Sequence, residues 1–254
     1  MTAELGRSTG QPARAALFAL RHWIGSGEPV PLHWGDLNLS ARPTDWHGLR
    51  EVLIEREYAA LAPALIRGPE PVVLDLGANI GAFALFVFSL APRAQVHSFE
   101  PAIATYGLLA RNAAANPAVC WHTYRSAAWS HDGTVSFATR GSSTAGRITT
   151  EGDEIVPALS LTSIVERCGG RIDVAKIDVE GAEEALLADG AKYLSAIETL
   201  VVELHPERCD VARVVEALRV AYSSLYQIPG RRSSKPLILA TRTTGGIDLP
   251  VYAA

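Results

Sequence analysis

The chain has 254 residues, 48% of them apolar and 20% charged, which is typical of a folded globular protein, and its net charge of −4 argues against general binding of nucleic acid. Three widely spaced cysteines (Cys120, Cys168 and Cys209) form no CxxC pair, which predicts neither a zinc framework nor disulfides and indicates a cytoplasmic location. The longest apolar stretch, residues 82–91, is too short to span a membrane, so we expect no membrane contact.

The N-terminal part of the chain is predicted to precede the main domain. Residues 1–28 are rich in Ala, Gly, Ser and Arg and are interpreted as an N-terminal extension, whose order the sequence leaves open, with a weak helical segment around residues 13–23. Residues 29–70 are predicted to form an N-terminal cap. Its expected elements are a strand pair over residues 30–39 and a helix capped by Thr44 or Asp45 that ends near Arg67.

A repeated pattern of strand, turn and helix occupies residues 71–254. The expected strands cover residues 72–74, 95–99, 119–124, 172–177, 199–204, 223–228 and 237–241. The expected helices cover residues 82–91, 103–115, 162–169 (capped by Thr162) and 183–190, with another starting near Pro206; an insert with a hairpin at residues 134–137 follows the third strand. This alternation predicts an α/β fold, a doubly wound, mostly parallel, seven-stranded sheet with an N-terminal helical and hairpin cap.

The first strand ends in the segment DLGANIG, which runs from Asp75 to Gly81. In a doubly wound sheet, ligands bind beyond the carboxyl ends of the strands, where the strand order reverses. The glycines allow a tight turn, but packing alone also produces such segments. The turn lacks the second glycine of the dinucleotide fingerprint. The Asp75 carboxylate would repel a pyrophosphate, whereas it suits a cation such as the ammonium group of a methionine moiety.

The second strand ends with Glu100, directly before Pro101. A carboxylate at this position can accept two hydrogen bonds from a ribose diol, although a solvated acid after a strand is the alternative interpretation. Together, Asp75 and Glu100 would satisfy an adenosyl group that carries an amino acid. This pair predicts S-adenosylmethionine as the cofactor.

Charged residues also follow the fourth and fifth predicted strands. The segment KIDVEG places Asp178 and Glu180 on one side of the sheet, and ELHP does the same for Glu203 and His205. Charges at the ends of buried strands indicate a reacting centre. The alternatives are that Glu180 serves the next helix and that His205 is an ordinary core histidine.

Five segments in this order resemble the FkbM family of S-adenosylmethionine-dependent methyltransferases: VVLDLGANIGAF, VHSFEP, RSAAWSHDGTVSF, DVAKIDVEGAE and VVELHPE. The segment LREVLIEREYAAL resembles the lead-in helix of that family, and the resemblance covers roughly residues 45–240. It implies the class I methyltransferase (Rossmann-like) fold and methylation of a hydroxyl, often on a sugar or a secondary metabolite. It gives the N-terminal extension no role.

The resemblance also implies roles for individual positions. Those assigned to the methionine part of the donor are Asp75, Gly77, Ala78, Asn79 and Gly81. Those assigned to the adenosine part are Glu100 and Pro101 for the ribose and Ser126 and Ala127 for the adenine, with Trp129 as a cover or a core aromatic. Arg56 and Tyr58 would close the donor pocket, unless they belong to a solvated helix face.

Methyl transfer to an aliphatic hydroxyl needs the acceptor aligned and its proton removed. We expect Asp178 or His205 to act as the general base, with Glu180 and Glu203 orienting it or the substrate. In a second version, Asp178 and Glu203 hold a divalent cation such as Mg²⁺. The sequence does not decide between the two.

Three other functions stay open from the sequence: N-methylation of a similar small molecule, a nicotinamide-dependent oxidoreductase, and a non-catalytic binding module. The missing second glycine of the dinucleotide fingerprint argues against the oxidoreductase. The three charges of Asp75, Glu100 and Asp178 argue against the non-catalytic binding module. The expected partner is a small-molecule acceptor, with no nucleic acid and with a homodimer allowed. Its pocket is expected between residues 141–155 and the loop 230–235. Arg231 and Arg232 would meet an acidic group there or, as the sequence favours, form a solvated basic turn.

Overall fold

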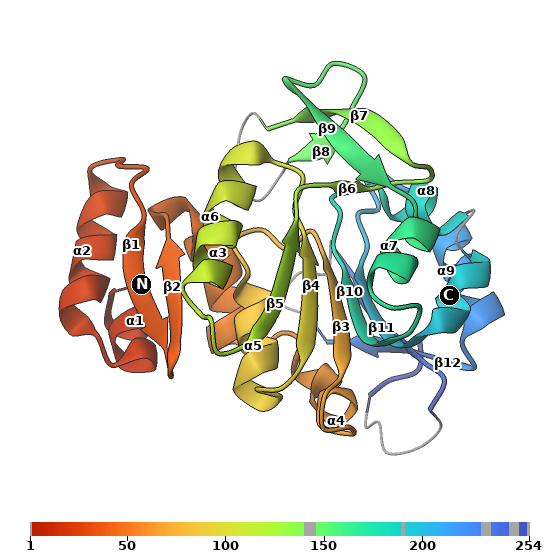
Figure 1. Cartoon of the computed structure of the whole chain (residues 1–254), viewed down its shortest axis with the longest axis horizontal. Helices are drawn as coiled ribbons and strands as arrows, with labels where there is room; N and C mark the ends of the chain where they lie inside the picture. Colours follow the sequence, from red (N-terminus) through yellow and green to blue (C-terminus); the bar gives the residue numbers. More distant parts are fainter. Residues whose placement is uncertain (1, 140–145, 189–190, 230–234, 244–248, 253–254) are drawn as a thin grey trace.

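A seven-stranded sheet forms the centre of the protein (Figure 1). The computed structural model describes residues 2–139, 146–188, 191–229, 235–243 and 249–252. The strand order is β12-β13-β11-β10-β3-β4-β5, and only β13 runs antiparallel to its two neighbours. The strands are β3 (Val72–Leu76), β4 (Gln95–Phe99), β5 (Cys120–Tyr124), β10 (Ile172–Ile177), β11 (Ile197–Glu203), β12 (Ser224–Ile228) and β13 (Leu237–Thr241). The predicted α/β sheet is therefore confirmed, with strand ends within two residues of those expected.

The chain order places the crevice of the sheet between β3 and β10. From β3 the chain moves outward through β4 to β5, and it then returns to β10 and continues to β11 on the opposite side. The loops after β3 and β10 consequently leave the sheet in opposite directions. A ligand can enter between them at the carboxyl ends of the strands.

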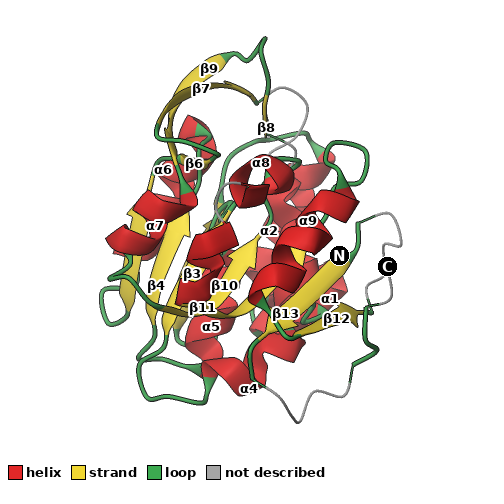
Figure 2. Cartoon of the chain, turned by 90° about the vertical axis from the view of Figure 1, so that its right-hand side faces the viewer, coloured by secondary structure: helices red, strands yellow, loops and turns green. Residues whose placement is uncertain are grey.

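Helices cover both faces of the sheet because alternate strand residues point to opposite sides. Val73 and Val174 belong to the core that contains α5 and the N-terminal cap, whereas Leu74 and Ala175 belong to the core that contains the later helices. The helices are α5 (Ala82–Leu90) and α6 (Ile103–Ala114) on the first face, and α7 (Leu161–Arg167), α8 (Glu183–Ala188) and α9 (Val211–Ala221) on the second. Figure 2 shows α7, α8 and α9 on the side of the sheet that faces the viewer. In the part of the chain described, no helix is both long and apolar enough to cross a membrane.

Two helix starts differ from the sequence expectation. Ser160, not Thr162, caps α7, since its hydroxyl accepts a hydrogen bond from the Ser163 N–H. The last helix begins at Val211 and not near Pro206, because the Asp210 side chain caps it.

The N-terminal residues form two helices, α1 (Thr2–Thr9) and α2 (Pro12–Trp23), although the sequence predicts only a weak helical segment there. Phe18 of α2 is fully buried, and its ring packs edge-on against Trp46 with centroids 6.3 Å apart. The predicted strand pair is present as β1 (Val30–Trp34) and β2 (Leu37–Ala41). The extension therefore packs on the cap through an aromatic contact.

The single helix predicted up to Arg67 is replaced by a series of short helical turns. They are η1 (Pro43–Asp45), α3 (Trp46–Leu49), η2 (Arg50–Ile54), η3 (Ala59–Leu61) and α4 (Ala62–Leu65). The chain breaks at Arg56, whose φ of +56° is incompatible with a helix, and Asp45 bonds to Arg42 instead of capping a long helix. The break directs Glu57 and Tyr58 into the cavity described below.

The insert after β5 forms a small second sheet rather than a hairpin alone. Its order is β6-β9-β7-β8, with β6 (Ala127–Ala128), β7 (Gly133–Ala138), β8 (Arg147–Ile148) and β9 (Glu154–Leu159). In Figure 1 and Figure 2 this sheet lies beyond one end of the central sheet. Phe137 and Ile148 of this sheet line the same cavity as the loops of the central sheet.

Candidate active site

A cavity of about 590 Å³ opens at the carboxyl ends of the central strands. The turn after β3, the end of β4, the segment at residues 126–128 and the ends of β10 and β11 contribute to its walls, together with Glu57 and Tyr58. Its volume lies in the range of about 300–1,000 Å³ that small-molecule and cofactor sites occupy. The cavity therefore meets the size requirement of a nucleoside cofactor site.

The turn after β3 depends on a glycine at position 77. Gly77 has a φ of +73°, and a Cβ atom there would lie 1.7 Å from the carbonyl oxygen of Asp178. Three residues that the sequence assigned to the donor site, Gly77, Ala78 and Asn79, line the cavity. Gly81 has a different role: a Cβ atom there would lie 2.4 Å from the Trp121 ring, and Gly81 does not line the cavity.

Asp75 lies beneath this turn and not in the cavity. Its side chain is fully buried, and one carboxylate oxygen is 3.3 Å from Nζ of Lys176. Lys176 also donates to the carbonyl oxygens of Leu76, at 3.3 Å, and Gly77, at 3.0 Å. Burial raises the pKa of Asp75, and the Lys176 ammonium opposes that rise. A direct contact of Asp75 with the methionine ammonium group is not available here, so we interpret Asp75 as a residue that positions the turn through Lys176.

Glu100 lines the cavity and connects the ends of β3 and β4. Its two carboxylate oxygens accept hydrogen bonds from the N–H groups of Asn79 and Ala102, each at 3.0 Å. Burial raises the pKa of Glu100 to about 7, despite these two hydrogen bonds. Each oxygen has a second lone pair with which it can accept a bond from a hydroxyl. Pro101 also lines the cavity.

Of the remaining predicted donor-site residues, some face the cavity and others do not. Ser126 and Ala127 line it. Tyr58 also lines it, packed edge-on against Phe83 with centroids 5.1 Å apart, and burial raises its pKa well above the usual value. Trp129 packs against the small sheet, which agrees with the alternative interpretation of this residue as a core aromatic. Arg56 is exposed and does not line the cavity.

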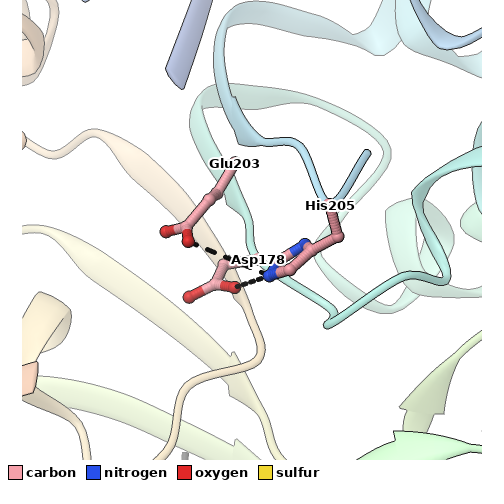
Figure 3. A group of neighbouring side chains, drawn as sticks. All are labelled: Asp178, Glu203 and His205. Carbon is pink, nitrogen blue, oxygen red and sulfur yellow. Dashed lines mark ion pairs between the residues drawn. The ribbon is translucent and has the colours of Figure 1, made fainter. Parts of the chain in front are cut away.

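The ends of β10 and β11 bring Asp178, Glu203 and His205 together (Figure 3). One oxygen of Asp178 and one of Glu203 lie 4.0 Å and 3.8 Å from Nε2 of His205. Asp178 and Glu203 line the cavity. Oδ1 of Asp178 is buried and has no hydrogen-bond partner among the described residues. Burial and the charge of Asp178 raise the pKa of Glu203 to about 8.

His205 lies behind the two carboxylates. It is fully buried and does not line the cavity. Its Nδ1 atom is 2.8 Å from Glu183, a residue that the sequence assigned only to the first turn of a helix. This position does not support direct proton transfer from an acceptor to His205. It fits a residue that positions Asp178 and Glu203.

Glu180 lines the cavity but is held by cations. Its carboxylate is 2.7 Å from Nη1 of Arg208 and 3.4 Å from Nζ of Lys235. Sequence reasoning assigned no role to Arg208 and only a place in the acceptor loop to Lys235, because both lie far from Glu180 in the chain. Arg231 and Arg232, predicted to lie at the acceptor pocket, fall outside the described residues, as do residues 140–145 of the insert.

Comparison with known proteins gives a family match and several partial relatives. The model of the methyltransferase FkbM domain matches residues 75–222, more than half of the chain. The hexuronic acid methyltransferase AglP of Haloferax volcanii is 29% identical over 141 residues, which are 54% of this chain and 56% of AglP. The 31-O-demethyl-FK506 methyltransferase FkbM of Streptomyces tacrolimicus is 42% identical over 64 residues, 25% of this chain and 24% of that protein.

The chain thus spans about half or less of the length of the curated relatives it matches. Among solved structures, monomeric WbdD aligns with a TM-score of 0.47 and 17% identity over 79% of this chain and 43% of WbdD.

Proposed function

Because the chain belongs to the FkbM family of methyltransferases, we propose that it transfers a methyl group from S-adenosylmethionine to a hydroxyl group of a small molecule. One observation carries the proposal: a single cavity is lined by Glu100 at the end of β4 and by Asp178 and Glu203 at the ends of β10 and β11. One cavity thus contains a carboxylate that can bind a ribose and two carboxylates that can act on an acceptor.

The donor would lie across the ends of β3 and β4. Glu100 would accept hydrogen bonds from the ribose, Gly77 and Asn79 would border the methionine part, and Ser126 and Ala127 would lie beside the adenine. The fit rests on the size of the cavity and on the Gly77 turn, where a backbone without a side chain adjoins the space. When bound, S-adenosylmethionine supplies a methyl group on a sulfonium centre that is already activated for displacement.

We assign the general base to Asp178, because it lines the cavity and its Oδ1 atom has no hydrogen-bond partner among the described residues. The acceptor oxygen forms a bond to the methyl carbon as the bond from that carbon to sulfur breaks. The acceptor proton passes to Asp178. His205, 4.0 Å from Oδ1 of Asp178 and buried, acts as a positioning residue.

The acceptor class follows from the need for a base. An aliphatic hydroxyl is a poor nucleophile until its proton is accepted, whereas a neutral amine attacks with its free electron pair. The placement of two acids beside the cavity therefore favours O-methylation over N-methylation. A hexuronic acid and 31-O-demethyl-FK506 are the first acceptors to test, since relatives are named for them. Family membership argues against the nicotinamide-dependent oxidoreductase.

Two measurements test the proposal. Isothermal titration calorimetry with S-adenosylhomocysteine is expected to show one site in the wild-type protein, and absence of binding would contradict the donor assignment. Transfer of a labelled methyl group is then measured on hexuronic acids, on 31-O-demethyl-FK506 and on their amino analogues. Asp178→Asn is expected to lower kcat roughly 100-fold on a hydroxyl acceptor with S-adenosylhomocysteine affinity unchanged within threefold. Transfer to the amino analogues alone would overturn O-methylation.

A further inference from the structure

Lys235 reaches from the segment before β13 into the group of acids at the ends of β10 and β11. Its Nζ atom lies 2.9 Å from Nε2 of His205, 3.4 Å from Oε1 of Glu180 and 3.6 Å from Oε1 of Glu203. The side chain is only 21% exposed, and Lys235 lines the cavity. The ammonium group therefore lies beside Glu203, one of the two side chains that the sequence predicted as metal ligands, and beside His205, which lies behind both of them.

We propose that Lys235 is a catalytic residue whose ammonium group takes the place of a divalent metal ion at Asp178, Glu203 and His205, so that methyl transfer proceeds without a metal. This inference rests on the proposed function for its catalytic part. In it, the ammonium contacts the acceptor oxygen and stabilises the negative charge that develops there as the proton moves to Asp178. Lys235 keeps its own proton throughout the reaction.

The geometry leaves little room for a metal ion. The three candidate ligand atoms of Asp178, Glu203 and His205 lie within 4.8 Å of one another, a spacing that could surround an ion. An ion bound to them would lie about 2.0–2.2 Å from each ligand atom. Nζ of Lys235 is already 2.9 Å from the histidine nitrogen and 3.6 Å from the Glu203 oxygen. A divalent ion would consequently meet a positive charge at very short range.

The contact between Lys235 and His205 also assigns the protons. Nζ of Lys235 and Nε2 of His205 face each other among the carboxylates of Glu180, Glu183 and Glu203. The two nitrogens are 2.9 Å apart, so only one can donate to the other. Lysine is the stronger base and has only donors, so Nε2 of His205 accepts. Nδ1 of His205 then donates to Glu183.

This arrangement removes Nε2 of His205 from the set of free metal ligands. One oxygen of Asp178 and one of Glu203 remain as candidate ligands, and the Lys235 ammonium offsets part of the negative charge that would attract the ion. Removal of the ammonium group should uncover all three ligand atoms together. The predicted consequence is that a metal site appears only when Lys235 is replaced.

The test measures Mn²⁺ binding by electron paramagnetic resonance in the wild-type protein and in Lys235→Met and Lys235→Ala. We expect at least tenfold tighter binding in both variants than in the wild type, and loss of that gain when Asp178→Asn is added. Arg213→Met removes a 71% exposed cation from the surface and serves as the control that leaves Mn²⁺ binding unchanged. Equal binding in the wild type and in the Lys235 variants would overturn the inference.

Two kinetic measurements complete the test, and the first of them uses the wild-type protein and does not depend on the folding of any variant. Methyl transfer in the presence of excess EDTA is expected to keep its rate within twofold, and a tenfold loss would overturn the metal-free reaction. Lys235→Met is expected to lower kcat at least 30-fold with KM for S-adenosylmethionine within threefold, and an unchanged kcat would overturn the catalytic role. If the proposed function is wrong, S-adenosylhomocysteine does not bind to the wild-type protein. That outcome is separate from the Mn²⁺ result and leaves it unaffected.

Discussion

Nδ1 of His205 lies 2.8 Å from Oε1 of Glu183, and neither side chain is exposed. Glu183 begins α8 and His205 follows β11, so the contact joins the loop between β10 and α8, which carries Asp178, to the end of β11, which carries Glu203. The same Glu183 oxygen accepts a hydrogen bond from the Gly181 N–H at 3.1 Å. This buried pair therefore determines where the His205 ring lies behind Asp178 and Glu203.

Replacement of Glu183 should destabilise the protein because it leaves Nδ1 of the buried His205 without its hydrogen-bond partner. Glu183→Ala is expected to lower the free energy of unfolding by about 3–5 kcal/mol, the usual consequence of removing one partner of a buried pair. Urea denaturation measures the change. Glu184→Ala, on the same helix but with its side chain 29% exposed beside Arg213, is the matched control and should cost less than about 1 kcal/mol. Equal losses in the two variants would contradict the structural role of the pair.

Gly77 should tolerate no side chain. In Gly77→Ala the new Cβ atom would lie 1.7 Å from the Asp178 carbonyl oxygen at a φ of +73°, so the turn after β3 has to move. We expect a loss of about 2 kcal/mol or more in unfolding free energy and at least tenfold weaker S-adenosylhomocysteine binding. Gly68→Ala is the control, since a Cβ atom there meets nothing within 4 Å. Calorimetry and thermal unfolding of both variants check the prediction, which fails if Gly77→Ala binds like the wild type.

Glu100 should make donor binding depend on pH. Its pKa is raised to about 7 by burial, so the carboxylate gains a proton below that pH and loses part of its ability to accept hydrogen bonds. The affinity of the wild-type protein for S-adenosylhomocysteine is expected to increase as pH rises from 6 to 8. Glu100→Gln should bind roughly 10- to 100-fold more weakly at pH 8 and lose most of this pH dependence.

The control is Glu70→Gln, because the side chain of Glu70 is 47% exposed. This variant should leave both the affinity for S-adenosylhomocysteine and its pH dependence unchanged. Calorimetry at three pH values provides the data. A wild-type affinity that is constant between pH 6 and pH 8 would show that the Glu100 carboxylate does not contact the donor.

Glu203 should lower stability at alkaline pH. Its pKa rises from 4.5 to about 8 on folding, because burial and Asp178 disfavour its negative charge. The contribution of Glu203 to stability is therefore fully present below pH 4.5 and is lost as pH rises through 8. Glu203→Gln removes this titration, so at pH 8.5 the variant should be more stable than the wild type by on the order of 2 kcal/mol.

Urea denaturation between pH 5 and pH 8.5 measures the difference for Glu203. The difference between Glu203→Gln and the wild type should grow with pH. Glu207→Gln, with a side chain 52% exposed, is the control and should follow the wild type at every pH. A constant difference across this pH range would contradict the raised pKa.

Local patterns in the sequence were sufficient to predict the parallel sheet and the position of the binding crevice. The run at residues 72–74 is apolar on both faces, and a strand buried in a parallel sheet needs such a run. The glycines and the acids that follow the strands were also visible, and Glu100, Asp178 and Glu203 do line the cavity. These predictions rest on periodicity and turn chemistry, which involve residues close together in the chain.

Only the tertiary structure decided which charged residues face the cavity. Asp75 and Asp178 both lie at the ends of strands, but the register of β3 and β10 places Lys176 opposite Asp75 and withdraws that acid from the cavity. Glu183 and Lys235 meet His205 from segments 22 and 30 residues away. Burial and pairing of charges depend on strand register and on where distant segments return, and neither is encoded in a local pattern.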